Sequence, residues 1–271
     1  MKRIGIIGGG AVGLLLASYL AERHDVTLYT RSKTGAAFVE RDGRTGDRPV
    51  RLEKIERFKT PDLVFVATKS YDVTDVIPYL ENIEVPVIFL QNGMGHIEAA
   101  SRVKRPIFAV NEHGAMREGE FGVLHTGKGR IRYGDERVGL EELSPELAFE
   151  FTAPIAPVMI AKLFINAVVN PITAVHGVRN GEILTSPGLL EDAMGVYREM
   201  CLLFPEADVD FETIRGVIER TAQNRSSMLE DVSKGRRTEI EPIVGFALAH
   251  GEEKAPLLRR YYEEVKRREE R

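Results

Sequence analysis

Residues 4–13, Ile-Gly-Ile-Ile-Gly-Gly-Gly-Ala-Val-Gly, decide the fold of this chain. They begin with a short β-branched run, which is typical of a buried parallel strand. Gly8, Gly10 and Gly13 follow with the spacing G-x-G-x-x-G, and good helix formers continue from Leu14. The glycines therefore lie between a predicted strand and a predicted helix, the context in which this spacing indicates dinucleotide binding.

Each glycine of this loop has a separate expected role. Gly8 allows a tight turn, Gly10 lets a pyrophosphate approach the backbone, and Gly13 lets the helix pack closely on the strand. The N–H groups at the start of the helix then face the phosphates. We therefore predict a cofactor-binding loop that consists of Gly8, Gly9, Gly10, Ala11, Val12 and Gly13.

The residues after the second predicted strand, 26–29, indicate which dinucleotide is preferred. An acid at that place holds the ribose 2′-hydroxyl of NAD, whereas an arginine accommodates the 2′-phosphate of NADP. Residues 30–33 contain no acid but include Arg31 and Lys33. A guanidinium can bind a phosphate through two hydrogen bonds, and a carboxylate would repel it. The sequence favours NADPH, with NADH as a weaker alternative. The non-functional alternative is that these residues form only a solvated basic turn.

Two further predicted strands, 62–68 and 86–90, are each followed by polar residues. Lys69 comes after the first strand and Asn92 after the second. In an open α/β sheet, ligands bind outside the carboxyl ends of the strands. Lys69 and Asn92 are therefore candidates for contacting the cofactor or the substrate, although Asn-Gly alone often marks only a turn.

Weaker patterns surround these strands. Residues 34–60 are charged and contain turn signals, so we expect them to be irregular. A strand is predicted over 107–110, and residues 121–125 with 129–133 suggest a hairpin.

The composition is that of a soluble globular protein, with 43% hydrophobic and 29% charged residues and a net charge of −4. This charge gives no reason to expect nucleic acid or a membrane as a partner. Glycines interrupt the apolar run after Lys2-Arg3, which argues against a signal peptide and for a cytoplasmic protein. Cys201 is the single cysteine, and His113 and His125 lack ligand-like spacing, so we predict no metal site.

The second half of the chain changes character near residue 154, where helical patterns replace strand patterns. We predict an α/β Rossmann domain over 1–153, followed by an all-α domain over 154–271. A helix over 158–170 is apolar nearly all round, so we expect it to be buried. Pro171 should kink or end this helix.

Lys162, Asn166 and Asn170 are the polar side chains of that helix, and they form one stripe at i, i+4 and i+8. Burying them without partners would cost about 1–3 kcal/mol for each polar group. We therefore expect a polar cleft, the alternative being a solvent-facing edge.

Two later features have no unique interpretation from the residues alone. Ser227 with Glu230 fits a capping box, which would account for Ser227 fully. Nothing in the sequence distinguishes Glu239 from Glu241.

Over nearly its whole length, the chain resembles the 2-dehydropantoate 2-reductase (ketopantoate reductase) family. The glycine loop is unspecific, but a Lys-x₃-Asn-x₃-Asn helix followed by Ser-Met-Leu-x-Asp and Thr-Glu-Ile is quite specific. The matching motifs are Gly8–Gly13, Thr68-Lys69, Gln91-Asn92-Gly93, Lys162 with Asn166 and Asn170, Asn180-Gly181-Glu182, Asn224, residues 226–231 and Thr238-Glu239-Ile240.

This resemblance implies reduction of ketopantoate to pantoate by NADPH, in pantothenate and coenzyme A biosynthesis. It implies an active site between a Rossmann domain and an all-α domain. Lys162 would be the general acid, Glu239 would support catalysis, and Ser227 would bind the substrate carboxylate. The other residues implied are Arg31 at the 2′-phosphate, Lys69 and Asn92 at cofactor and substrate, and Asn166, Asn170, Asn180 and Asn224 at the substrate.

Two other functions remain open at this point. One is a related NAD(P)-dependent hydroxy acid dehydrogenase with another substrate, and the other is a non-catalytic NADP-binding redox sensor. A sensor would not need a proton donor such as Lys162. The expected partners are a small 2-keto acid and a second copy of the chain in a homodimer.

Overall fold

A computed structural model describes residues 1–270. The chain forms two compact units, which we describe separately. The first consists of Met1–Gln91 and His96–Ile155, and the second of Asn92–Gly95 and the helical part from Ala156 onward. The short segment Asn92–Gly95 therefore belongs with the second unit, although the chain on both sides of it belongs to the first.

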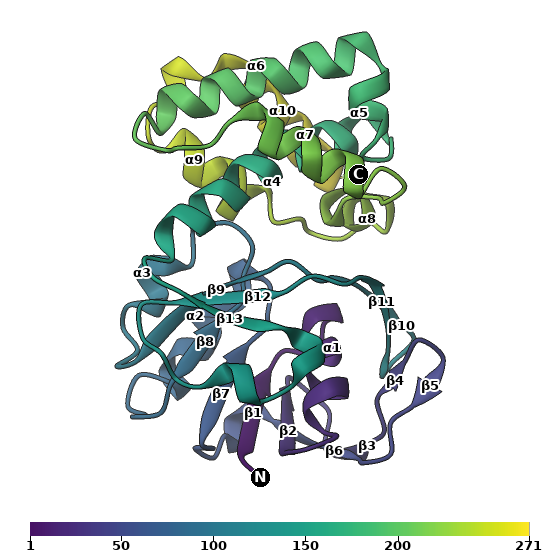
Figure 1. The fold of residues 1–271 in the computed structure, drawn as a ribbon, viewed down its shortest axis with the longest axis vertical. Coiled ribbons are helices and arrows are strands. Elements are labelled where there is room, and N and C mark those ends of the chain that lie inside the picture. Colours follow the sequence, from purple (N-terminus) through teal and green to yellow (C-terminus); the bar gives the residue numbers. More distant parts are fainter. Residues whose placement is uncertain (271) are drawn as a thin grey trace. The chain divides into compact units, whose positions relative to one another are not determined.

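A nine-stranded sheet forms the centre of the first unit (Figure 1). Its parallel part has the order β6-β2-β1-β7-β8-β9. Counted along these six strands, the order is 3-2-1-4-5-6, that of the Rossmann fold. The predicted fold class is confirmed. The bounds are β1 Arg3–Ile7, β2 Asp25–Thr30, β6 Val50–Lys54, β7 Leu63–Val66, β8 Val87–Phe89 and β9 Pro106–Asn111.

Shorter strands extend this sheet and form a second one. β3 (Gly35–Ala37) is antiparallel to β6, and at the other edge β12 (Ile131–Gly134) pairs with β9 and with β13 (Phe149–Thr152). The second sheet has the order β10-β11-β4-β5. Its bounds are β10 Gly114–Glu118, β11 Gly122–Gly127, β4 Glu40–Arg41 and β5 Arg44–Thr45.

Two expectations for this region were wrong. Residues 34–60 are not irregular, because β3 to β6 lie there. The hairpin predicted from 121–125 and 129–133 does not form, because β11 pairs with β10 and β12 pairs with β9. Gly119, with a φ of 60°, lies between β10 and β11, so the chain turns there and not between residues 125 and 129. Where several short strands follow one another, the sequence pattern does not specify which of them pair.

Helix α1 (Ala11–Leu20) is buried along most of its length and packs with the apolar core of this unit. A second cluster of buried residues includes Ile7, Val64, Val66, Val87 and Phe89. The remaining helices are single turns: α2 Val73–Val76, α3 Ile97–Ala100, and 3₁₀ turns at Ile55–Arg57, Ser70–Asp72, Ile77–Tyr79, Leu140–Glu142 and Pro145–Leu147.

The second unit is helical and is built around α4 (Ala156–His176), which packs against α6, α7, α8 and α10. α4 is long and apolar enough to span a membrane, but 61% of its most apolar window is buried inside the structure, as in a core helix. The other bounds are α5 Glu182–Thr185, α6 Pro187–Leu203, α7 Phe211–Arg220, α8 Ser227–Ser233, a π-helical turn at Glu241–Gly245, α9 Phe246–Leu248, a 3₁₀ turn at Glu252–Lys254 and α10 Pro256–Glu269.

A kink or an end of the helix was expected at Pro171, and the structure contradicts the second of these, because α4 continues to His176. The proline removes one backbone hydrogen bond, at a cost of about 3 kcal/mol. Ile172 and Ala174, in the turn that follows, are buried in the core. Thr173 Oγ1 also donates to the carbonyl oxygens of Val169 and Asn170, at 2.8 and 3.1 Å. Burial of this turn offsets the cost of the proline.

Candidate functional site

The glycine loop of the first unit has the backbone geometry that its spacing predicts. Gly8 has a φ of 109°, and a Cβ on it would lie 2.8 Å from the carbonyl carbon of Ala67. A Cβ on Gly13 would lie only 1.9 Å from the carbonyl oxygen of Gly8. Gly10 differs, because a Cβ there would meet no described atom within 4 Å. The fold itself therefore requires Gly8 and Gly13, whereas Gly10 leaves open space.

α1 begins directly after Gly10 and has no acidic side chain in its first turn. Gly10 is the N-cap residue and has no side chain that could accept from the first N–H groups of the helix. These groups have no intrahelical acceptor and carry the positive end of the helix dipole. A pyrophosphate fits this arrangement because it can accept hydrogen bonds there without meeting a side chain.

Gln91 lies two residues after the end of β8 and binds the chain at the end of the neighbouring strand β7. Its Nε2 donates to the carbonyl oxygens of Val66 and Thr68, at 2.9 and 3.1 Å. Among residues 1–270, Gln91 Oε1 and Thr68 Oγ1 are buried and make no hydrogen bond. Gln91 thereby fixes the chain immediately before the half-buried Lys69. Gln91 belongs to the Gln91-Asn92-Gly93 motif of the sequence, but that motif did not predict these hydrogen bonds to the sheet.

The basic residues after β2 are engaged by carboxylates. Arg31 Nη2 lies 2.5 Å from Asp72 Oδ1, and Lys33 pairs with Glu120. The side chain of Arg31 is still 75% exposed, so the pair lies in water. An incoming phosphate would therefore meet a guanidinium that is already held in place by Asp72.

In the second unit, the polar stripe of α4 is neither fully buried nor at a solvent-facing edge. Lys162 and Asn166 are half-buried, and Asn170 is 7% exposed. Leu163, Phe164, Ala167 and Val168, which alternate with the stripe along the helix, belong to the apolar core. The helix therefore carries a partly accessible polar stripe beside its buried core face.

Glu239 is the member of the Glu239/Glu241 pair that the structure places beside another predicted site residue. Its side chain is buried, and Asn92 Nδ2 donates to Glu239 Oε2 at 3.1 Å. The Asn92–Gly95 segment is attached at the same place, since Met94 N donates to the carbonyl oxygen of Pro242 at 2.9 Å. Gly93 has a φ of 73°, and a Cβ on it would lie 2.1 Å from that oxygen. The Asn-Gly pair therefore does more than reverse the chain.

Asn180 and Asn224 are also brought together in this unit. Asn180 N donates to the carbonyl oxygen of Asn224 at 3.0 Å, and Asn180 Nδ2 donates to Thr221 Oγ1 at 3.0 Å. Asn180 Oδ1 is buried and has no hydrogen-bond partner among the described residues. A buried acceptor of this kind is suited to a ligand hydroxyl or N–H group.

The capping box predicted for Ser227 and Glu230 does not form. Ser226 is the N-cap of α8, and its Oγ accepts from Leu229 N at 3.0 Å and lies 2.7 Å from Thr173 Oγ1. Glu230 instead pairs with Arg225 and Lys234. Ser227 is exposed at the start of the helix. Two adjacent serines offer the same capping signal, and only the register of the helix decides between them.

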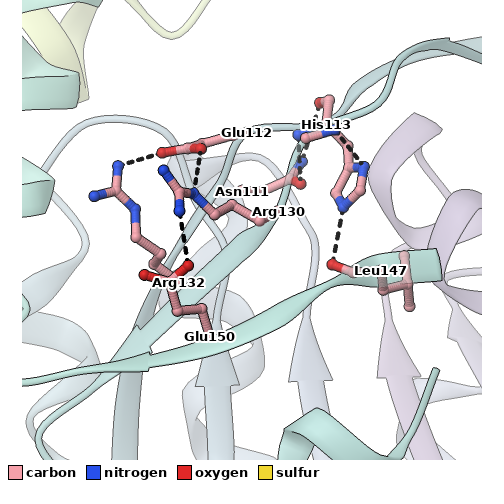
Figure 2. Close-up of polar contacts among 8 residues, drawn as sticks. Asn111, Glu112, His113, Arg130, Arg132, Leu147 and Glu150 are labelled. Atoms are coloured by element: carbon pink, nitrogen blue, oxygen red, sulfur yellow. Dashed lines mark hydrogen bonds and ion pairs between the residues drawn. The ribbon is translucent and has the colours of Figure 1, made fainter. Parts of the chain in front are cut away.

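A further polar cluster lies in the first unit (Figure 2). Arg130 pairs with Glu112 and Glu150, and Arg132 pairs with Glu112. Glu112, Arg130 and Glu150 line part of an open groove of about 550 Å³. Beside them, His113 Nε2 contacts the carbonyl oxygen of Leu147 at 3.0 Å, and His113 Nδ1 lies 3.0 Å from His125 Nε2. The two histidines thus bond to one another, a pairing that their sequence spacing does not reveal.

Comparison with known proteins gives one consistent result. Residues 4–137 match the family model of ketopantoate reductase PanE/ApbA, and residues 155–269 match the model of its C-terminal part. A 2-dehydropantoate 2-reductase of Bacillus subtilis (strain 168) is 36% identical over 276 residues, covering 91% of this chain and 89% of the relative. The crystal structure of a probable 2-dehydropantoate 2-reductase from Bacillus subtilis has a TM-score of 0.85 and 32% identity, covering 98% of this chain and 99% of that one.

More distant solved structures share the fold. A dimeric ketopantoate reductase from Staphylococcus aureus has a TM-score of 0.82 at 20% identity, with 99% of each chain covered. A D-mandelate dehydrogenase in complex with NADH has a TM-score of 0.87 at 18% identity, covering 99% of this chain and 98% of that one. At these sequence identities, the similarity shows a shared fold only. The two family models, which together match nearly the whole chain, show that the protein belongs to the ketopantoate reductase PanE/ApbA family.

Proposed function

We propose that this protein reduces 2-dehydropantoate (ketopantoate) to pantoate with NADPH, as a cytoplasmic enzyme of pantothenate and coenzyme A biosynthesis. The observation that carries the proposal is the polar stripe of α4, in which Lys162 and Asn166 are half-buried and Asn170 is buried, beside the core face of the helix. A lysine held at this depth among amides is suited to a polar, water-poor substrate site. Family membership adds the reaction and the substrate.

The residues of the second unit have distinct proposed roles. Lys162 donates a hydrogen bond to the carbonyl oxygen of the substrate, stabilises the charge that develops there and supplies the proton. Glu239, oriented by Asn92, supports catalysis beside it. Ser227 binds the substrate carboxylate. The amides proposed to line the substrate site are Asn92, Asn166, Asn170, Asn180 and Asn224.

The cofactor is proposed to be NADPH, which supplies the hydride when bound. The residues from Gly8 to Gly13 would hold the pyrophosphate, and the space at Gly10 fits this use. Arg31 would bind the 2′-phosphate, while Lys69 and Asn92 would contact the cofactor as well. A nicotinamide dinucleotide agrees with the Rossmann strand order, and the preference for NADPH over NADH rests on Arg31.

The test is NADPH oxidation at 340 nm with ketopantoate, run beside NADH and beside Lys162→Ala. We expect turnover with NADPH, weaker use of NADH, and a loss of ~10²-fold or more in the variant, as for removal of a general acid. A parent protein that binds NADPH but turns over only another 2-keto acid would reject ketopantoate as the substrate. Cofactor binding without turnover of any keto acid would instead favour a redox sensor. Full activity in Lys162→Ala would refute the mechanism.

The proposal also includes a homodimer, in keeping with the dimeric Staphylococcus aureus enzyme that shares the fold. Sedimentation at micromolar concentration should give twice the mass of 30.3 kDa calculated for one chain. A single species at the mass of one chain would reject it.

A further inference from the structure

The last turn of α10 carries a carboxylate that, unlike its neighbours, is withdrawn from solvent. The side chain of Glu269 is 9% exposed, whereas that of Glu263 in the same helix is 51% exposed and pairs with Arg259. Glu269 Oε1 accepts two hydrogen bonds from Thr238, one from the backbone N and one from Oγ1, both at 2.7 Å. Lys266 Nζ lies 3.1 Å from Glu269 Oε2. One oxygen of the carboxylate therefore binds a residue of a distant segment, and the other faces Lys266 of the same helix.

The charge of Glu269 suits this use. Burial raises its pKa, but the two hydrogen bonds from Thr238 and the contact with Lys266 outweigh burial and hold the pKa below its ordinary value. Glu269 is therefore ionised at neutral pH and only accepts hydrogen bonds. Charge-assisted bonds of this kind are stronger than those between neutral groups.

The bonds from Glu269 lead directly to the backbone around Glu239. Thr238 Oγ1, which donates to Glu269, also accepts from Ile240 N at 3.1 Å. Thr238 and Ile240 flank Glu239, so its backbone is fixed on both sides. Residues 236–238 have no regular secondary structure that could fix it instead.

α10 holds the following turn as well. Tyr262 Oη donates to Glu241 Oε2 at 2.5 Å, and Glu241 begins the π-helical turn. Asn92 holds the Glu239 side chain itself. Glu239 is therefore held by its side chain through Asn92 and by its flanking backbone through α10.

We propose that Glu269 is a positioning residue, which fixes residues 238–240 through Thr238 and so aims the Glu239 carboxylate at the substrate. This inference rests on the proposed function, since it takes Glu239 to support catalysis. A small displacement of such a group is costly, because a shift of ~1 Å can reduce a rate by ~10²-fold.

The first test compares Glu269→Ala with Glu269→Gln, and uses Glu263→Ala as the matched control from the same helix. Glu269→Ala removes the acceptor for Thr238 and should lower kcat for ketopantoate reduction by about 10-fold, with KM for NADPH within about 2-fold of the parent. Glu269→Gln keeps a carbonyl oxygen for Thr238 and should recover most of kcat. Glu263→Ala should match the parent. Equal kcat in Glu269→Ala and the parent would overturn the proposal.

A double-mutant cycle separates positioning from general stabilisation. If Glu269 acts through Glu239, then Glu269→Ala should cost less than about 2-fold further in a Glu239→Gln background, because the two effects overlap. Independent effects that multiply would overturn the proposal. If Glu269→Ala does not fold, Thr238→Val, with Thr238→Ser as its conservative control, replaces it in the same cycle.

Hydrogen exchange supplies a readout that needs no turnover. The amides of Thr238 and Ile240 should exchange faster in Glu269→Ala than in the parent, and their exchange rates should be unchanged in Glu263→Ala. If the parent protein does not reduce ketopantoate, the proposed function is rejected. Faster exchange in Glu269→Ala would in that case still support the role of Glu269 in fixing residues 238–240. Unchanged exchange would reject the clamp, whatever the activity.

Discussion

The glycine loop and the Glu239 region represent two ways of building a binding site. The loop is contiguous in sequence, and backbone sterics determine its shape: Gly13 lies against Gly8, and Gly8 lies against Ala67. Glu239 is instead held by side chains from distant parts of the chain, Asn92 and, through Thr238, Glu269. A contiguous site leaves a spacing motif in the sequence, whereas a dispersed site leaves isolated polar residues with no visible relation.

This difference predicts how each site fails. The loop should fail by steric overlap, which destabilises the whole first unit. The Glu239 region should fail by loss of orientation, which lowers activity while the fold persists. Four predictions follow, from the largest expected effect to the smallest, and the first two test this contrast directly.

The largest effect is expected for Gly13→Ala compared with Gly10→Ala. The new methyl group at residue 13 would lie 1.9 Å from the Gly8 oxygen, so the loop must move. We expect a destabilisation of about 3 kcal/mol or more in urea unfolding, at the upper end of overpacking effects. Gly10→Ala meets no described atom within 4 Å and should unfold within about 0.5 kcal/mol of the parent. It should nevertheless weaken NADPH binding, measured by fluorescence titration. Equal stability of the two variants would contradict the steric account.

The next effect concerns the pair of Asn92 and Glu239. Asn92→Asp replaces the donor at 3.1 Å by a second carboxylate, which repels Glu239. We expect kcat at pH 7 to fall by ~10- to 100-fold, as for a misplaced catalytic group. Asn92→Ala removes the donor without adding charge and should lose less. If both variants lose activity equally across pH, repulsion is not the cause.

These regions also show what could be predicted from the sequence. The strand, glycine loop and helix at the start of the chain follow from local pattern and steric need, and so does the polar stripe of α4. The pairing of Asn92 with Glu239 was not predictable, because 147 residues separate them and only the fold joins them. The same holds for the choice between Ser226 and Ser227 as the cap, which depends on helix register. The continuation of α4 past Pro171 depends on the burial of Ile172, a tertiary effect that outweighs local propensity.

A smaller effect is expected at the exposed pair of Arg31 and Asp72. Arg31→Ala should raise KM for NADPH by about 10-fold and leave KM for NADH nearly unchanged, because only NADPH carries the phosphate. Asp72→Asn releases Arg31 from a solvent-exposed ion pair, which is worth about 0–1 kcal/mol. It should therefore lower KM for NADPH by no more than about 5-fold. The ratio of the two KM values, measured for each variant, is the readout. A rise in KM for NADPH in Asp72→Asn would show that Asp72 orients Arg31 and does not compete with the phosphate.

The smallest effect is a pH dependence in the first unit, at residues that belong to neither site. Gly129 N donates to His113 Nδ1 at 3.1 Å, so that nitrogen carries no proton and must accept from His125 Nε2. Tyr19 Oη, 2.9 Å from His125 Nδ1, completes a chain in which both imidazoles are neutral.

Burial lowers the pKa of His113 and of His125, and the neighbouring His113 adds to the effect at His125. The unfolded chain binds these protons at a pKa near ~6.5, so it takes up more protons than the folded chain as the pH falls. Stability is thus fully present above pH ~6.5 and declines below it, until the lower folded pKa values are reached. Urea midpoints measured between pH 7.5 and 5 should fall, and His125→Gln should reduce the part of this fall that comes from the pair. An unchanged slope in His125→Gln would assign the pH dependence to other groups and leave the histidine pair without a role in stability.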